Sequence, residues 1–359
     1  MWRNVCVLAA LSVFVWIHSA YSQTDPNGDL RQRAVREYQS GRYAQAETLF
    51  RARLEAVKDD EAERARTIAD LGSVFLEEER LQEAEQAFLS ALAIYRKRAD
   101  KAGTTLLLRH LGAAYSLQRR DDEAISVLRE ALTMARKQPQ ALAKITAEIL
   151  NSLGVAHVRR QDHKKAQKYF EEGTALLSTE PGPHGAEMTS LLNNLGVVHY
   201  VRRNFDRAEQ TLLQALKLTT EEVGPSHPAL TYTLSALGGL YREMKRYQDA
   251  EEQFQRALAI LRQGGNDFDM RVSRTLQGLG ETYIKAGKTA EAEAALHQAS
   301  IIARRHVHTH PDMPAVLEAY SRFLKTVGKV QDAQQVQAEA QAGRAKRSLT
   351  IRAYQLSKP

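Results

Sequence analysis

Apolar and small residues recur along this chain with the spacing of paired amphipathic helices. Within residues 237–257 (LGGLYREMKRYQDAEEQFQRA) they stand at Gly238, Tyr241, Tyr247, Ala250, Phe254 and Ala257. The spacings of three and four inside each half match one face of a helix. The polar stretch at residues 243–246 separates the halves and predicts the turn between a first and a second helix.

The same helix pair is predicted repeatedly, because a leucine-glycine pair returns at a nearly constant interval. The glycines are Gly72, Gly112, Gly154, Gly196, Gly238 and Gly280, and subtracting consecutive numbers gives steps of 40, 42, 42, 42 and 42. An alanine follows each glycine by twelve positions, at Ala84, Ala124, Ala166, Ala208, Ala250 and Ala292. A fixed period of this size is typical of a solenoid. Since a glycine inside a helix costs roughly 1 kcal/mol relative to alanine, these matched positions predict a close crossing of the two helices.

The pattern L-G-x-x-Y, a turn, and A-x-x-x-F-x-x-A resembles the tetratricopeptide repeat. Its 42-residue period, longer than the usual 34 or so, is similar to that of the kinesin light chain subtype. The linker at residues 224–228 (GPSHP) resembles the G-x-x-H-P corner of that subtype. The resemblance implies an all-α fold, a right-handed α-α superhelix of about eight helix-turn-helix repeats. These span residues 30–343, with clear repeats at about 65–305 and degenerate repeats at both ends.

Four positions of each first helix lie on one side: six and three residues before the glycine, and one and four after it. The resemblance implies that this side lines a concave groove for an extended peptide or a partner segment. The candidate groove residues are Arg109, Asn151, Val155, Asn193, Val197, Tyr200, Tyr232, Arg242 and Gln277. An asparagine amide can both donate to and accept from a peptide backbone, and the resemblance gives Asn151 and Asn193 this role. The alternative is that inward asparagines are ordinary polar surface residues.

Residues 1–22 have the layout of a secretory signal peptide. Arg3 precedes an apolar run at residues 5–17, and Ala20 and Ser22 place small side chains before a cut at Gln23. The run is shorter than the roughly 20 residues of a spanning helix, although a retained N-terminal anchor is the alternative. We expect an exported bacterial protein, periplasmic or secreted, with a linker at residues 23–29 and no transmembrane segment after cleavage.

Composition limits which functional groups and binding partners the mature chain can have. Cys6 is the only cysteine and lies in the predicted signal peptide, so no thiol remains for a disulfide or a thiolate metal site. Without Arg3, 49 basic and 43 acidic side chains leave a net charge of +6, a smaller excess than nucleic-acid binders show. No P-loop, dinucleotide fingerprint, nucleophile elbow or recognisable acid-base pair occurs. We therefore expect a noncatalytic protein-protein interaction scaffold with no catalytic residue, cofactor or metal, and with a protein or peptide as its partner.

Two other surfaces offer alternative functions. Basic pairs recur near the turns, and stacked they would form a positive ridge for a cell-envelope polyanion or lipid headgroups: Arg119 and Arg120, Arg159 and Arg160, Arg202 and Arg203, and Lys245 and Arg246. Cations also match the dipole at the end of a helix, and we favour that structural explanation. His306, His308 and His310 alternate in one loop, but without a thiol or a helical histidine pair a metal-dependent enzyme is the weaker alternative. Residues 344–359 are expected to form a basic, weakly structured tail.

Overall fold

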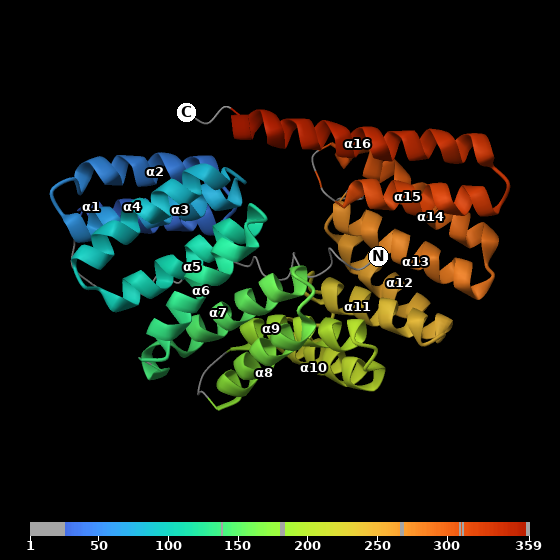
Figure 1. Ribbon diagram of the computed structural model, residues 1–359, viewed down its shortest axis with the longest axis horizontal. Coiled ribbons are helices and arrows are strands. Elements are labelled where there is room, and N and C mark those ends of the chain that lie inside the picture. Colours follow the sequence, from blue (N-terminus) through green and yellow to red (C-terminus); the bar gives the residue numbers. More distant parts are fainter. Residues whose placement is uncertain are drawn as a thin grey trace. The chain divides into compact units, whose positions relative to one another are not determined.

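The computed structural model describes residues 26–137, 139–179, 184–265, 269–308, 310 and 312–356. The predicted signal peptide therefore lies outside the described residues. These residues form sixteen α-helices and no strand (Figure 1). The helices are α1 (Pro26–Gln39), α2 (Tyr43–Ala56), α3 (Glu61–Glu77), α4 (Leu81–Lys97), α5 (Lys101–Leu117), α6 (Asp121–Ala135), α7 (Pro139–Arg159), α8 (His163–Thr179), α9 (Gly185–Val201), α10 (Phe205–Val223), α11 (Leu230–Glu243), α12 (Tyr247–Gln263), α13 (Met270–Ala286), α14 (Thr289–His306), α15 (Met313–Thr326) and α16 (Val330–Leu356).

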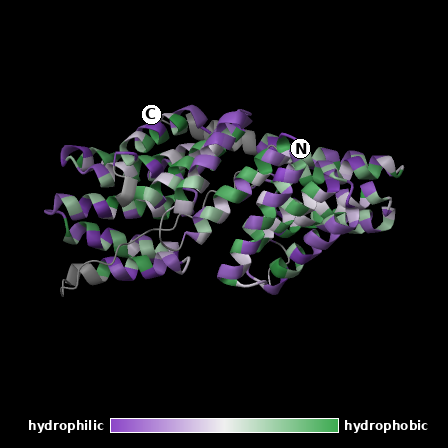
Figure 2. Cartoon of the chain, turned by 90° about the horizontal axis from the view of Figure 1, so that it is seen from below, coloured by the Kyte–Doolittle hydropathy of each residue, from purple (hydrophilic) through white to green (hydrophobic). Residues whose placement is uncertain are grey.

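Contacts divide the chain into two compact units, and the division falls inside α9. Unit 1 is Met1–Val198 and unit 2 is His199–Pro359. In unit 1, consecutive helices pair as α1–α2, α3–α4, α5–α6 and α7–α8; in unit 2 they pair as α11–α12, α13–α14 and α15–α16. The second helix of a pair also packs on the first helix of the next, as α4 does on α5. The predicted all-α fold of repeated helix pairs is confirmed, and apolar and hydrophilic residues alternate along the helices (Figure 2).

Small residues let the two helices of each pair approach closely. The six alanines of the repeat, from Ala84 to Ala292, are completely buried. A Cβ atom built on Gly154 would lie 2.3 Å from Cε1 of Phe170, far inside van der Waals contact. Equivalent clashes would occur between Gly72 and Phe88, Gly112 and Leu128, Gly238 and Phe254, and Gly280 and Leu296. Gly196 is likewise buried. An aromatic or leucine side chain of the second helix thus fills the space that the glycine leaves on the first helix.

A left-handed residue follows the first helix of every helix pair in the described residues. The backbone φ is positive at Gly41, Glu79, Arg119, Gln161, Arg203, Lys245, Gly287 and Gly328. The N–H of the following residue then donates a hydrogen bond to a carbonyl in the last turn of the helix. Arg246 N, for example, donates to Tyr241 O at 2.8 Å. Because a residue with a Cβ atom loses roughly 1–2 kcal/mol in this conformation, the packing on either side must hold these turns in place.

Both ends of the array differ from the sequence-based expectation. Helix α1 begins at Pro26, inside the segment expected to be a linker. Helix α16 continues to Leu356, so the expectation of a weakly structured tail from Arg344 is wrong for most of that segment. Residues 344–358 contain neither glycine nor proline, and helix propensity extends the helix past the last repeat position. None of the helices in the described ranges is both long and apolar enough to cross a membrane.

We predict that Gly154→Ala lowers the free energy of unfolding by about 1–3 kcal/mol, because the new Cβ overlaps Phe170. Urea unfolding followed by circular dichroism measures the loss.

The matched control is Gly264→Ala, whose Cβ would meet its nearest atom at an ordinary 3.5 Å. Its effect should stay within about 0.5 kcal/mol. Equal stability of the Gly154→Ala and parent proteins would contradict the close-crossing explanation.

Candidate functional site

The first helices of successive repeats lie beside one another within each unit. Helix α5 contacts α7 in unit 1, and α11 contacts α13 and α13 contacts α15 in unit 2. We call the shared surface of α5, α7 and α9 in unit 1 the inner face. It consists of Leu106, Arg109, Ala113, Ser116, Glu148, Asn151, Val158, Ser190 and Asn193.

Asn151 lies at the middle of the inner face and retains 8% of its exposure. Its Oδ1 accepts a hydrogen bond of 2.8 Å from Nδ2 of Asn194, whereas its own Nδ2 has no partner among the described residues. Asn194 is completely buried, and its Oδ1 has no hydrogen-bond partner in the described chain. Asn193 is also buried, at 4% exposure. The structure thus joins Asn151 to Asn194, which the sequence analysis missed although the two asparagines adjoin in the sequence.

Charged side chains on the first helices are paired with charges on the next first helix. In unit 1, Arg109 Nε lies 3.2 Å from Glu148 Oε2, and Lys144 Nζ lies 2.7 Å from Glu187 Oε1. The other pairs of this type are Arg31 with Asp70 and Arg242 with Glu281, and Arg274 pairs with Asp312 immediately before α15. The candidate groove residue Arg109 is therefore already neutralised by Glu148.

Two of the candidate residues of unit 2, Arg242 and Gln277, meet at Glu281. Arg242 Nη1 lies 3.0 Å from Glu281 Oε2 and donates to the Gly278 carbonyl at 3.3 Å. Glu281 Oε1 in turn accepts a 2.9 Å hydrogen bond from Gln277. Burial, reinforced by the charge of Glu243, raises the pKa of the half-buried Tyr200 to about 12. Tyr232 is half-buried as well. Arg242 and Gln277 thus belong to one bonded group around a single carboxylate.

Two candidate groove residues belong to the apolar core instead. Val155 and Val197 are each only 3% exposed, and Val155 packs in a cluster with Phe170 and Leu191. The position after the repeat glycine is covered in these two repeats, and the place of these valines on the groove wall stays a prediction.

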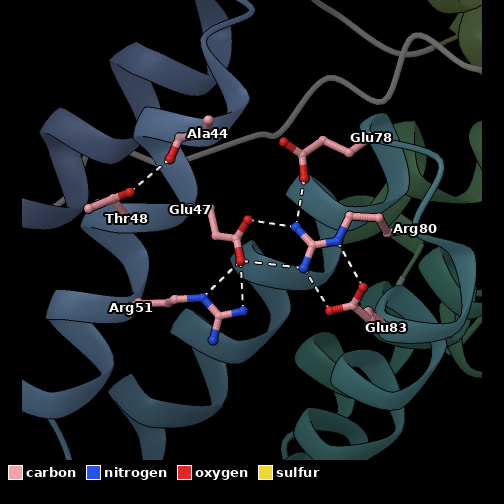
Figure 3. Close-up of polar contacts among 7 residues, drawn as sticks. All are labelled: Ala44, Glu47, Thr48, Arg51, Glu78, Arg80 and Glu83. Carbon is pink, nitrogen blue, oxygen red and sulfur yellow. Dashed lines mark hydrogen bonds and ion pairs between the residues drawn. The ribbon is translucent and has the colours of Figure 1, made fainter.

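A second set of ion pairs connects repeats at the turns, and we call it the edge ladder. Arg80 lies between α3 and α4, where its Nη1 is 2.6 Å from Glu47 of the preceding α2 (Figure 3). The same guanidinium pairs with Glu78 and Glu83 and lies 4.3 Å from the ring centroid of Phe75. The other members of the edge ladder, each a cation, an aromatic ring and a glutamate of the previous repeat, are Arg120, Tyr115 and Glu85; Arg246, Tyr241 and Glu209; and Lys288, Tyr283 and Glu251.

The edge ladder is interrupted in two successive repeats, and the first interruption lies where α6 meets α7. Ile125, His157 and Asp162 occupy the positions of the glutamate, the ring and the cation. His157 stacks on Tyr169 with ring centroids 5.5 Å apart, and its Nδ1 lies 3.7 Å from Asp162. All three residues of the motif are therefore replaced together.

Four of the eight cations in the basic ridge considered from the sequence pair with carboxylates. Arg120 and Arg246 belong to the edge ladder, while Arg159 pairs with Asp121 and Arg160 with Asp122. These contacts favour the structural explanation of the basic pairs.

The loop around His308 and His310 is held by structural contacts. His310 Nδ1 accepts from the backbone N–H of Asp312 at 3.3 Å, and the Asp312 carboxylate pairs with Arg274. Over the described part of the chain, no three histidine, cysteine or acidic side chains converge as metal ligands would. Thr309 and Pro311 lie outside the described residues.

We predict that the ladder pair Glu85 and Arg120 couples by about 0.5–1 kcal/mol in a double-mutant cycle with Glu85→Gln and Arg120→Gln. The carboxylate is mostly buried, whereas the matched pair Arg96 and Glu130 is about half exposed on both sides. The exposed pair should couple by less than about 0.3 kcal/mol. Urea unfolding of the parent and the six variants provides the comparison, and equal coupling in the two cycles would contradict a special role for the ladder.

We also predict that acid destabilises the protein through His110. Complete burial, together with the nearby Arg109 charge, lowers the pKa of His110 well below its usual 6.5. Its Nε2 lies 3.0 Å from the Arg109 guanidinium, and its ring stacks on Phe88. The unfolded chain therefore takes up a proton near pH 6.5 while the folded chain does not. Stability should be complete above that pH and fall below it by up to about 1.4 kcal/mol per pH unit.

His110→Gln keeps an acceptor for Arg109 and removes the titration. Urea unfolding at pH 7 and pH 5 should show a smaller acid-induced loss in this variant than in the parent. His157, whose pKa burial also lowers, accounts for part of the remaining loss. An identical pH dependence in both proteins would show that His110 does not carry the effect.

Comparison with known proteins agrees with this geometry. Models of the tetratricopeptide repeat match residues 63–137, 103–179, 187–263 and 272–312. No curated protein matches the chain. Aspartyl phosphate phosphatase F from Bacillus subtilis has a similar fold, with a TM-score of 0.63 at 12% identity over 91% of this chain and 96% of that one.

Two further solved structures are similar. The Cut9–Hcn1 hetero-tetramer of APC/C matches with a TM-score of 0.59 at 19% identity over 81% of this chain; the chain spans 48% of that relative's length. Kinesin light chain TPR-like repeats from Podosopora anserina match with a TM-score of 0.46 at 18% identity, over 58% of this chain and 97% of that one.

The family models together match more than half of the chain, and each matched segment lies on helix pairs that cross at the glycine positions of the repeat. The chain belongs to the tetratricopeptide repeat family.

Proposed function

We propose that this protein is a noncatalytic scaffold that binds an extended segment of a partner protein on the inner face of unit 1. Stacked helical repeats typically present an extended concave surface to a partner. The similar Cut9–Hcn1 structure is itself a hetero-tetramer. The predicted signal peptide supports the further proposal that the protein acts outside the cytoplasm.

The observation that carries the proposal is the hydrogen-bonding state of Asn151. Its Nδ2 donor has no partner among the described residues, while its Oδ1 is fixed by Asn194. A fixed amide with an unused N–H can donate to a peptide carbonyl whatever the side chains of that peptide are. Such a contact holds a chain in place without reading its sequence, which is the chemistry of a general backbone clamp.

We predict that Asn151→Asp abolishes capture of the partner without unfolding the repeat. The aspartate retains an oxygen to accept from Asn194, but it cannot donate to a peptide carbonyl. The control is Asn204→Asp, the same substitution at an exposed residue before α10 in unit 2. Crosslinked pull-downs from the native cells would compare both variants with the parent, and thermal unfolding would verify the fold of each.

A partner that the parent and Asn204→Asp capture but Asn151→Asp does not would support the inner face. Capture by all three proteins would place binding elsewhere and refute the proposed site. Sequencing the N-terminus of protein recovered from outside the cytoplasm tests export, for which we expect a chain beginning at Gln23. Recovery of intact protein from the cytoplasm alone would refute export.

A further inference from the structure

We infer that the inner face of unit 1 selects an uncharged segment of about seven residues with small apolar or hydroxyl side chains. This inference rests on the proposed function of that face. It specifies the class of partner segment that the face accepts.

The half-exposed side chains of the inner face provide the first argument. Apart from Glu148, they are uncharged and mostly small or aliphatic: Leu106, Ala113, Ser116, Val158 and Ser190. They come from three successive first helices, so a chain crossing these helices meets apolar methyl groups and hydroxyls at each step. Small apolar and hydroxyl side chains complement such a surface, because they bury apolar area and leave few polar atoms without a partner.

The charges on these helices provide the second argument, since they already neutralise each other. Glu148 pairs with Arg109, whose side chain is only 9% exposed, and Lys144 pairs with Glu187. A charged ligand side chain would have to break one of these partly buried pairs or lose its own hydration without a counter-charge. Both routes are unfavourable. The inner face therefore discriminates against charge instead of requiring one sign.

The spacing of the helices gives the length of the segment. Packed helices lie about 8–10 Å apart, so α5, α7 and α9 together span roughly 20 Å. An extended chain rises about 3.3 Å per residue. Some six or seven residues are thus needed to cross from α5 to α9, with Asn151 of the central helix α7 near the midpoint.

A random seven-residue peptide library displayed on phage and selected on the complete mature chain tests the inference. We expect the enriched peptides to lack Asp, Glu, Lys and Arg at their central positions. The Kd of a synthetic enriched peptide should change less than about twofold between roughly 50 and 300 mM salt, because no ligand charge is screened. Placing Asp or Lys at its central position should weaken binding at least about tenfold.

Two matched variants locate the bound peptide. Ser116→Arg puts an arginine without a partner on the inner face, and Ser90→Arg puts one on the exposed side of α4. Ser116→Arg should weaken the enriched peptide about tenfold and should select acidic peptides from the same library. Ser90→Arg should behave as the parent does.

The outcomes separate the two proposals. Parent-selected peptides with a consistent charge and a steep salt dependence would overturn the inference of an uncharged segment, while inner-face binding would stand if Ser116→Arg still abolished it. Enriched peptides that Ser116→Arg leaves unaffected, or no enrichment at all, would overturn both the inference and the proposed function.

Discussion

The close crossing of two helices at a glycine is the contact on which the rest of each repeat depends. In a stacked array each repeat touches only its neighbours. A change in the distance between the helices of one pair is therefore not compensated by contacts with a shared core. The distance between Gly154 and Phe170 fixes how far α7 stands from α8. That distance in turn sets where α7 meets the first helices beside it. The alignment of the inner face is therefore a result of packing on its far side.

Two ion pairs between neighbouring first helices share one offset. Arg109 and Glu148, and Arg242 and Glu281, are each 39 positions apart. This is a 42-residue period less three residues, or about one helical turn. The cation and the anion of these pairs meet because the two first helices are displaced along their axes by about one turn. The inner face can thus be neutral although its individual residues are charged.

The helix pairs and their crossings could be predicted from the sequence because periodicity and small residues are local properties. The partner of Asn151 could not be predicted. Asn193 and Asn194 point in different directions, and only the rotation of one helix against the next decides which of them meets Asn151. The exposure of the position after the glycine could not be predicted for a related reason, since it is covered at Val155 and Val197 whereas Ala113 at the same position stays partly open. The extension of α16 had no repeat pattern to indicate it, and helix propensity alone determined it.

The interrupted edge ladder bears on how such an array can change over time. A complete ladder position needs a glutamate from one repeat and a ring and a cation from the next, as Glu85, Tyr115 and Arg120 show. At the α6–α7 junction all three are different at once. A repeat transplanted to this junction would therefore bring only part of the three-residue motif and would leave it incomplete. The exchangeable module of this chain is consequently not the helix-turn-helix pair but the second helix of one repeat joined to the first helix of the next, which is the segment to preserve when repeats are recombined.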